Sequence, residues 1–467
     1  MKEAGPDGWA VEEFGRSGIA DHRWRRRLVA VASRAARRPG GRVTEVCVDD
    51  AERQGAYGLL ESATVHASDV GAGMFAACAR RAAGEAYVFW AIDGTSVTLT
   101  DRERRKDFGP IGTCSAGARG IKVMNAMMLS PSGVPLGISS QRWWTRPPKR
   151  RPKHRDCVPS DQKETRNWLE AMTETRKVMA THAPQTRCWF QLDREGDAWP
   201  MLTEAGREGS WFTIRSSWDR RVLVEGGQTY LRQLLAQQPV RGEYALEVRG
   251  MSKRQARTAT MVMRACKMTL QFRDKTTSRR FSMDLNVVQA VEEGSTPHGE
   301  KPIQWILLTN HPIQNTKDLT EVILGYSMRW RIEELHRTWK TGACRVEDTQ
   351  LRSTKAVIKW ATILIAVAVR IERIKQLSRE QPQSPASAEF SLLEIKATVL
   401  LRFGEAAKTK VPPGTSPSMG DVTLWIAQLG GYTGRTSSGG PPGSITIARG
   451  LQQVRVAAKA LKALASD

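Results

Sequence analysis

Charged and aromatic side chains recur at helical spacing in residues 326–340, which read YSMRWRIEELHRTWK. On a helix that turns about 100° per residue, they form two nearly opposite stripes, each about 60° wide. One stripe places a carboxylate among cations, so it predicts a metal-assisted phosphodiester site in which the cations hold phosphate oxygens. A solvated helix with ion pairs four residues apart is the alternative. The chemical stripe contains Tyr326, Arg329, Glu333, Arg337 and Lys340, and the apolar stripe contains Met328, Ile332, Leu335 and Trp339.

Two aspartates follow apolar, aromatic runs of strand length. Residues 86–92 (AYVFWAI) lead to Asp93, and residues 187–192 (RCWFQL) lead to Asp193. A carboxylate at the end of a buried strand costs desolvation free energy unless something compensates it, and a divalent cation is a natural partner. Each aspartate alone could equally cap a turn or a helix. Together with Glu333, they predict a site built from three carboxylates.

The spacing Tyr-(2)-Arg-(3)-Glu-(6)-Lys resembles the YREK signature of bacterial cut-and-paste DDE transposases of the IS-four family. Two further blocks in this region are similar to the family, WRIEE at 330–334 and WKTG at 339–342. Another block, QRWWTRP at 141–147, lies upstream. The blocks keep their order over most of the chain, and Asp93, Asp193 and Glu333 match the three acids of the family in order.

This resemblance implies an α/β fold with an RNase H-like catalytic core, in which two strands and a following helix present the acids. It implies an enzyme that binds transposon ends, cuts them by nicking and by forming and opening hairpins, and transfers the 3′ ends to target DNA. Two alternatives stay open. One is an RNase H-like endonuclease without strand transfer, and the other is a catalytically silent DNA-binding regulator descended from a transposase.

Phosphodiester cleavage of this kind uses two divalent ions about 4 Å apart, which activate the attacking oxygen and stabilise the leaving one. Oxygen ligands favour Mg²⁺, and Mn²⁺ is expected to substitute for it. We assign Asp93 as the ligand of both ions, Asp193 as a ligand of one and Glu333 as a ligand of the other. His336 lies on the flank of the helix and is expected at the surface rather than as a base.

The resemblance gives Tyr326, Arg329 and Lys340 a further task, which is to hold the phosphates around a nucleotide extruded from the duplex beside the cut. Trp305, in IQWILLTN, matches the tryptophan on which such a base stacks. An aromatic residue in an apolar strand is more often part of the core, and that interpretation of Trp305 stays open. Asp197 is expected to be a salt-bridged neighbour of the site and not a ligand.

The 139 residues between Asp193 and Glu333 are too many for a single connection from a strand to a helix. Runs of strand character lie at 211–214, 244–248, 259–263, 283–288 and 305–309. The sequence therefore predicts a β-rich insertion, at about 205–312, within a catalytic domain of residues 76–380. Members of the resembling family carry such an insertion.

The whole chain has 467 residues, a formal net charge of +23 and a pI near 10.1. This charge predicts a polyanionic partner, and double-stranded DNA is the leading one. No apolar run approaches about 18 residues and no secretory signal opens the chain, so we expect no membrane partner and a buried core helix at 361–369. Seven scattered cysteines without a CxxC pair suit a reducing cytoplasm.

Residues 21–38 show an amphipathic helical pattern with an arginine-rich side. The PGG sequence at 39–41 ends this helix, and a second helix-rich stretch continues towards residue 83. We expect residues 1–75 to form a small helical domain whose arginines follow the DNA backbone at transposon ends. A charged surface helix of a globular core is the alternative. The arginines expected to contact DNA are Arg23, Arg26, Arg27 and Arg34.

The last part of the chain is predicted to be mainly helical. A long helix at 354–380 closes the catalytic domain, and residues 381–385 (QPQSP) have the composition of a linker. In the resembling family the module at 386–467 dimerises, which implies a homodimer in a synaptic complex, although composition alone also allows a solubilising tail. The loop at 146–155 (RPPKRRPKHR) is expected to be a DNA-contacting arm or a solvated loop. The helices predicted in the module lie at 392–403, 422–429 and 447–465.

Overall fold

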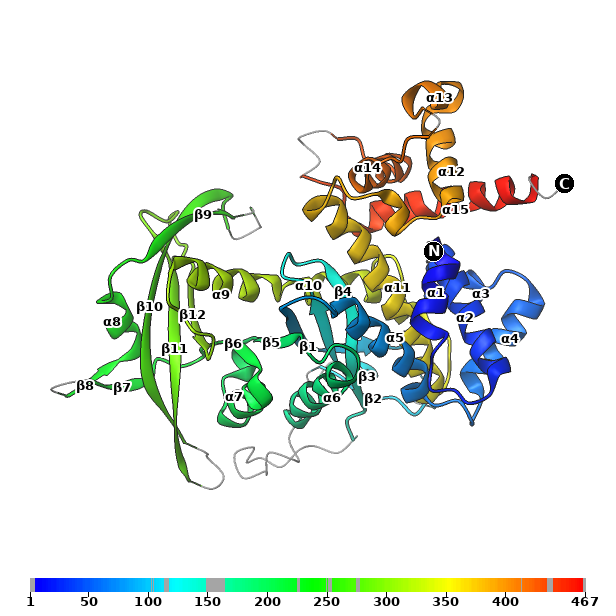
Figure 1. Cartoon of the computed structure of the whole chain (residues 1–467). Helices are drawn as coiled ribbons and strands as arrows, with labels where there is room; N and C mark the ends of the chain where they lie inside the picture. Colours follow the sequence, from blue (N-terminus) through cyan, green and yellow to red (C-terminus); the bar gives the residue numbers. More distant parts are fainter. Residues whose placement is uncertain are drawn as a thin grey trace.

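A large mixed sheet runs through the molecule, and helices from both ends of the chain gather at one end of it (Figure 1). The structure is a computed structural model, and the predicted α/β class with helical N- and C-terminal regions is confirmed. It describes residues 5–101, 103, 105–112, 117–147, 164–224, 227–248, 250, 254–273, 278–412, 414–434 and 440–464.

The first half of the sheet is compatible with an RNase H-like core. β1 (Tyr87–Thr98), β3 (Arg119–Leu129) and β4 (Pro135–Trp144) form an antiparallel meander. On the other side of β1, β5 (Arg187–Leu192) lies parallel to β1, and β6 (Trp211–Arg215) lies parallel to β5. The resulting order is β4-β3-β1-β5-β6, with the parallel strands next to the meander.

The second half of the sheet is antiparallel and continues from β6. β12 (Gln304–Thr309) pairs with β6, and β11 (Arg280–Glu293), β10 (Arg257–Arg273) and β9 (Gly242–Val248) follow. All the strands predicted between 244 and 309 are therefore present. The strand predicted at 211–214 is β6, which belongs to both halves because it pairs with β5 as well as β12. The shorter elements are β2 (Gly109–Pro110), β7 (Arg221–Val224), β8 (Gly227–Tyr230) and α8 (Leu231–Ala236).

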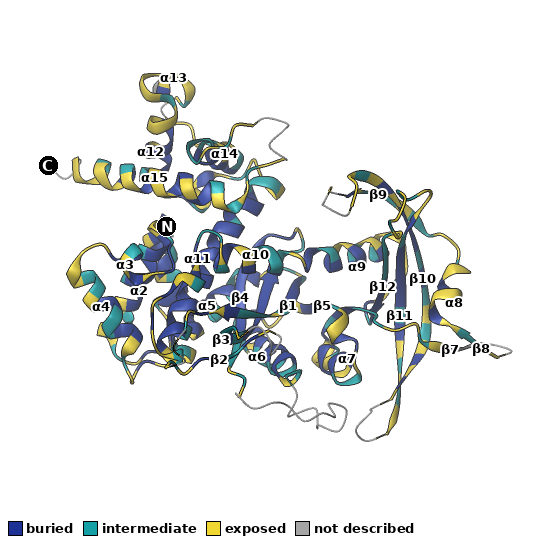
Figure 2. Ribbon diagram, turned by 180° about the vertical axis from the view of Figure 1, so that it is seen from behind, coloured by how far each residue is buried: buried dark blue, intermediate teal, exposed yellow. Residues whose placement is uncertain are grey.

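Side chains along β1 and β5 alternate between two cores, as expected for strands covered on both faces. Phe89 and Trp189 belong to the core on one face, whereas Trp90 and Phe190 belong to the core on the other. Figure 2 shows these central strands largely buried between the helices. The helices that contribute to the first core include α9 (Thr316–Met328), α10 (Arg331–Lys340) and α11 (Thr354–Glu380), and those of the second include α6 (Arg166–His182) and α7 (Trp199–Ala205).

The stretch predicted as one helix at 326–340 is two helices. α9 ends at Met328 and α10 begins at Arg331, because Arg329 and Trp330 form a turn between them. Backbone hydrogen bonds across the turn join residues three apart, which tightens the chain locally, and the 3.6-residue period gives no sign of this. The apolar stripe is nevertheless buried as predicted in Met328, Ile332, Leu335 and Trp339.

Residue 325 must be small for α9 to reach β1. A Cβ atom added at Gly325 would lie 2.4 Å from the Phe89 ring, which is closer than real Cβ contacts come. This close approach brings the end of α9 and the turn at 329–330 next to β1, where Asp93 lies.

The N-terminal region is helical, as predicted. Asp21 caps the arginine-rich helix by accepting a hydrogen bond from the Arg23 backbone N–H, and the helix ends before the predicted PGG stop. The buried α11 joins this region to the sheet, because Lys359 donates to the carbonyl oxygens of Leu60 and Ser62. The helices are α1 (Gly5–Phe14), α2 (His22–Arg37), α3 (Val43–Val46), α4 (Asp50–Glu61) and α5 (Ala67–Ala82).

The C-terminal helices share a third core with the end of α11, through Ile374 and Leu377. The three predicted helices of this region and the long helix at 354–380 are confirmed, and residues 361–369 are buried as expected. Within the described ranges, no helix combines the length and the apolar character needed to cross a membrane. The C-terminal helices are α12 (Leu392–Phe403), α13 (Ala407–Lys410), α14 (Met419–Leu429) and α15 (Ser444–Leu464).

Candidate active site

Asp93 and Asp193 lie at the same level on neighbouring parallel strands. The last paired residues of β1 and β5 are Ala91 and Gln191, and each aspartate follows two positions later. Because side chains alternate, both carboxylates project to the face of Ala91, which belongs to the first core. The prediction that Asp93 ends its strand is wrong. β1 continues to Thr98 in antiparallel pairing with β3.

Glu333 approaches the same face from the first turn of α10, whose apolar residues belong to the first core. Its carboxylate accepts a hydrogen bond from Arg329 at 2.9 Å, and this ion pair spans the turn between α9 and α10. Arg329 is only 6% exposed, so its guanidinium group interacts mainly with groups inside the protein.

The electrostatics of Asp93 link the three acids. Burial raises the pKa of Asp93 to about 7; the guanidinium of Arg329 opposes this shift, while the carboxylates of Asp193 and Glu333 add to it. The Asp93 carboxylate also accepts a hydrogen bond from the Gly94 backbone N–H at 2.9 Å. The site therefore holds more negative charge than its own groups neutralise.

A divalent cation would relieve this excess. Among the described residues, no three His, Cys, Asp or Glu side chains stand close enough together to hold one metal ion. A pair of ions needs no such trio, because Asp93 can be shared and each ion then takes one further carboxylate. The oxygen-only donor set and the raised pKa of Asp93 therefore fit two hard cations.

Tyr326 and Trp305 pack together beside these acids. The Tyr326 ring is buried and meets the Trp305 ring edge-on, with 5.4 Å between ring centroids. The Tyr326 hydroxyl lies beside the guanidinium groups of Arg215 and Arg329. Trp305 is partly exposed and packs against the first core, so it is both a core residue and a surface one.

A cleft of about 930 Å³ opens at Trp305. Two tryptophans that the sequence did not single out for DNA contact line it, Trp218, which is 62% exposed, and Trp330, which is 53% exposed. Their exposure could not be read from apolar patterning, and Arg215 was hidden at the end of a core strand. The cationic side chains of the lining are Arg194, Arg215, Arg232, Arg254 and Lys301.

The remaining residues of the chemical stripe are Lys340 and Arg337. Lys340 pairs with Glu347 at 3.4 Å, and Glu347 accepts a hydrogen bond from the Thr98 backbone N–H at the end of β1. Arg337 is exposed on the solvent side of α10. Asp197 is buried and paired with Arg220, which confirms the prediction of a salt-bridged neighbour.

His336 is buried, so the prediction that it lies at the surface is wrong. Burial lowers its pKa to about 3, with Lys340 adding to the shift. Asn125 on β3 lies 3.0 Å from the His336 Nε2 atom and accepts a hydrogen bond from Gln141 on β4 at 2.8 Å. The helical pattern could not reveal this, because Asn125, the polar partner of His336, lies on β3, far away in the sequence.

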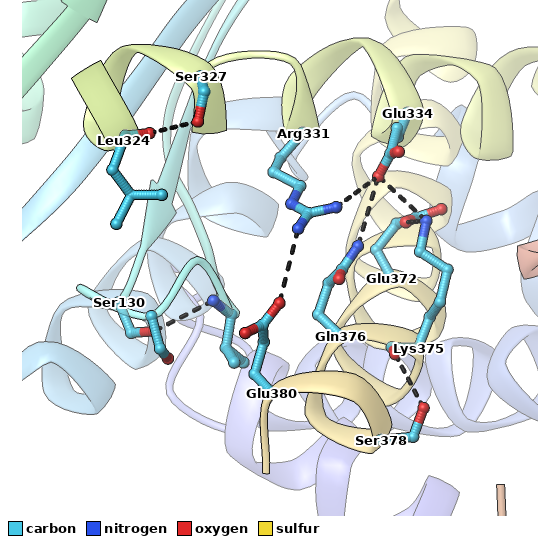
Figure 3. Close-up of polar contacts among 12 residues, drawn as sticks. Ser130, Leu324, Ser327, Arg331, Glu334, Glu372, Lys375, Gln376, Ser378 and Glu380 are labelled. Carbon is cyan, nitrogen blue, oxygen red and sulfur yellow. Dashed lines mark hydrogen bonds and ion pairs between the residues drawn. The ribbon is translucent and has the colours of Figure 1, made fainter. Parts of the chain in front are cut away.

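Another side of α10 presents Glu334, whose carboxylate accepts from three donors. Glu334 receives Lys375 at 3.1 Å, Arg331 at 3.3 Å and Gln376 at 3.4 Å (Figure 3). Burial alone would raise the pKa of Glu334, but the cations Lys375 and Arg331 outweigh it and hold the pKa below its usual range. This cluster joins α10 to α11.

The four arginines proposed for DNA contact differ in their surroundings. Arg26 and Arg27 are exposed on α2, and Arg27 lies over the Trp24 ring. Arg23 is exposed beside Asp21, whereas Arg34 is half-buried and paired with Glu52. Of the predicted basic loop, residues 148–155 lie outside the described residues.

One comparison with known proteins bears on this region. Residues 6–65 match the family model of the transposase DNA-binding domain. The match covers helices α1 to α4 with the arginine-rich α2, and it supports a transposase that binds DNA.

Proposed function

We propose that this chain is a cut-and-paste DNA transposase of the IS-four family, nearest within it to the transposase of the Tn-five transposon. The observation that carries the proposal is the convergence of Asp93, Asp193 and Glu333, whose mutual repulsion helps to raise the pKa of Asp93. The match at residues 6–65 supports DNA as the partner. Such an enzyme would nick transposon ends, form and open hairpins, and join the 3′ ends to target DNA.

Each acid has a separate task in this proposal. Two Mg²⁺ ions, or Mn²⁺ in their place, would supply an activated oxygen nucleophile and a stabilised leaving oxyanion. Asp93 would hold both ions because both other carboxylates interact with it, and Asp193 and Glu333 would hold one each. Arg329 would balance the carboxylates in the metal-free protein and bind a phosphate when the metals take over that charge.

The cleft beside Trp305 suits a distorted DNA end. Its cations can hold phosphates, and its exposed tryptophans offer flat faces to an unstacked base. Tyr326 packs against Trp305 and Arg329 lies over the Trp330 ring, so both would support the lining of this cleft. Lys340 would act after release from Glu347. Residues 1–75, through Arg23, Arg26, Arg27 and Arg34, would bind the inverted-repeat end.

Residues 386–467 would join two subunits into a synaptic complex, in which one subunit binds an end and its partner cuts it. We place this activity in the bacterial cytoplasm, on DNA of the nucleoid. Deleting residues 386–467 should leave binding to a single end but abolish paired-end complexes on native gels.

The proposal is tested by incubating the protein with the ends of its own element and Mg²⁺. Hairpins should appear on denaturing gels, and the 3′ ends should join to a target plasmid. Cut ends without any hairpin would remove the hairpin step, and cutting without joining would leave an RNase H-like endonuclease. A protein that binds ends but never cuts them would be the DNA-binding regulator instead.

A further inference from the structure

Asn125 connects the strand of one proposed catalytic acid to the helix of another. It lies directly opposite Asp93 in the antiparallel register of β1 and β3, so both side chains project to the same face of the sheet. Gln141 lies opposite Asn125 on β4. A row of polar side chains therefore crosses three strands and ends at Asp93.

His336 completes the connection from above the sheet. It follows Glu333 by three residues, which places the two side chains on neighbouring positions of one helical side. Asn125 uses its amide oxygen to accept from Gln141, so its amide nitrogen donates to the Nε2 atom of His336. The amide orientation is assigned from this network.

Polar contacts of Glu334 and Trp339 hold α10 to α11, but its apolar contacts do not by themselves fix its position over the sheet. Ile332, Leu335 and Trp339 bury the helix, but apolar contacts are not directional and tolerate small sliding movements. A hydrogen bond between two buried groups holds only within a narrow range of distance and angle. Leaving either group unpaired would cost desolvation free energy, so the pair resists displacement.

We propose that Asn125 and His336 are positioning residues that set the separation between Asp93 and Glu333, and thereby the affinity of the site for divalent cations. This inference rests on the proposed function. Neither side chain is assigned as a ligand, since Asn125 uses its amide oxygen on Gln141 and its amide nitrogen on the Nε2 atom of His336.

The test measures Mn²⁺ binding directly, by electron paramagnetic resonance on the DNA-free full chain, beside the melting temperature. His336→Phe removes the acceptor and should weaken Mn²⁺ binding about tenfold, as loss of outer supports commonly does. His336→Gln keeps an acceptor oxygen and should restore most of the affinity. Gln141→Leu perturbs only the far end of the row and should give a smaller loss of the same kind.

A matched control lies on the other face of the sheet. Ser139 on β4 and Thr175 on α6 are buried and form a hydrogen bond at 2.9 Å. Thr175→Val breaks a neutral contact between strand and helix of the same kind, so it should lower the melting temperature without changing Mn²⁺ affinity.

The outcomes separate this inference from the proposed function. If Asp193→Ala loses Mn²⁺ binding while His336→Phe and Gln141→Leu keep it, the positioning role is overturned and the proposed function stands. The Gln141→Leu and His336→Gln variants decide the question if His336→Phe fails to fold. A parent protein that neither binds Mn²⁺ nor cuts transposon ends overturns both.

Discussion

Glu333 and Glu334 are neighbours on α10, yet they lie in opposite electrostatic surroundings. On the side of Glu333, three carboxylates face one buried arginine, and the pKa of Asp93 is raised to about 7. On the side of Glu334, Lys375, Arg331 and Gln376 all donate, and the pKa of Glu334 is held below its usual range.

This contrast separates Glu334, whose ion pairs stabilise the fold, from the acids near Glu333, whose charge is not fully compensated by protein groups. A fully matched carboxylate has little to gain from a metal ion, because its donors already compensate its burial. An unmatched group of acids is costly in the metal-free protein and gains much from a cation. The two sides of one helix thus predict different responses to mutation, pH and metal.

The largest effect is expected from removing an acid on the unmatched side. Asp193→Ala should reduce cleavage below detection on denaturing gels, because one proposed cation loses its own carboxylate. Binding to transposon ends in gel-shift assays should stay within a few-fold of the parent. Glu334→Gln is the matched control and should keep cleaving; equal loss in both variants would erase the contrast.

Metal affinity should depend on pH through Asp93. Its folded pKa of about 7 lies above the ordinary value of 3.8, so the protonated form predominates below pH 7 and a cation must displace that proton. Mg²⁺ affinity, followed by calorimetry, should fall by up to about tenfold for each pH unit below 7 and level off above it.

The same shift makes a prediction for stability. Since the folded pKa of Asp93 is raised, the metal-free protein should lose stability as pH rises from about 4 to about 7. Asp93→Asn should therefore melt higher than the parent at pH 8 without metal. If the parent protein instead gains stability between pH 4 and pH 7, protein groups must already neutralise the charge of these acids.

Arg329 should affect one step more than another. Arg329→Ala is expected to slow hairpin formation by up to about a hundredfold and first nicking by less, because in the proposed function Arg329 would hold the distorted DNA flank rather than the metals. Lys340→Ala should act in the same direction more weakly, since Glu347 already holds that amine. Quenched time courses on end-labelled DNA distinguish the two steps.

The smallest effect on chemistry is expected on the matched side. Lys375→Met leaves the buried Glu372 and the neighbouring Glu334 without their shared cation, which should cost about 3 kcal/mol of unfolding free energy. Cleavage well below the melting temperature should stay close to that of the parent. A Lys375→Met variant with normal stability and impaired Mg²⁺ binding would contradict this assignment, because the Glu334 side would then serve metal binding and not the fold.

Local patterns predicted most of the secondary structure near the site. The apolar runs before Asp93 and Asp193 and the long helix at 354–380 were recognisable because a single segment contains each signal. The acids could be named in advance from their strands and from the family-like spacing around Glu333. Their close approach became visible only through the strand register of β1 and β5.

Several features of the site could not be predicted from the sequence, and two of them depend on residues far apart in the chain. His336 was expected at the surface because Asn125, its polar partner in the core, lies 211 residues earlier in the chain. The turn at Arg329 leaves the helical period nearly unchanged, so one helix was predicted where there are two. The ion pair between Glu334 and Lys375 could likewise not be predicted, because it depends on α11 lying beside α10.

The position of α11 in the chain also sets an order for folding during synthesis. Its residues 354–380 supply core contacts for the N-terminal helices, including a hydrogen bond from Trp360 to the Gly41 carbonyl. At roughly ten residues per second, the ribosome needs on the order of half a minute to reach α11 after finishing α5. During that interval the nascent N-terminal helices expose apolar surface that α11 later covers, so this is when a chaperone would find them.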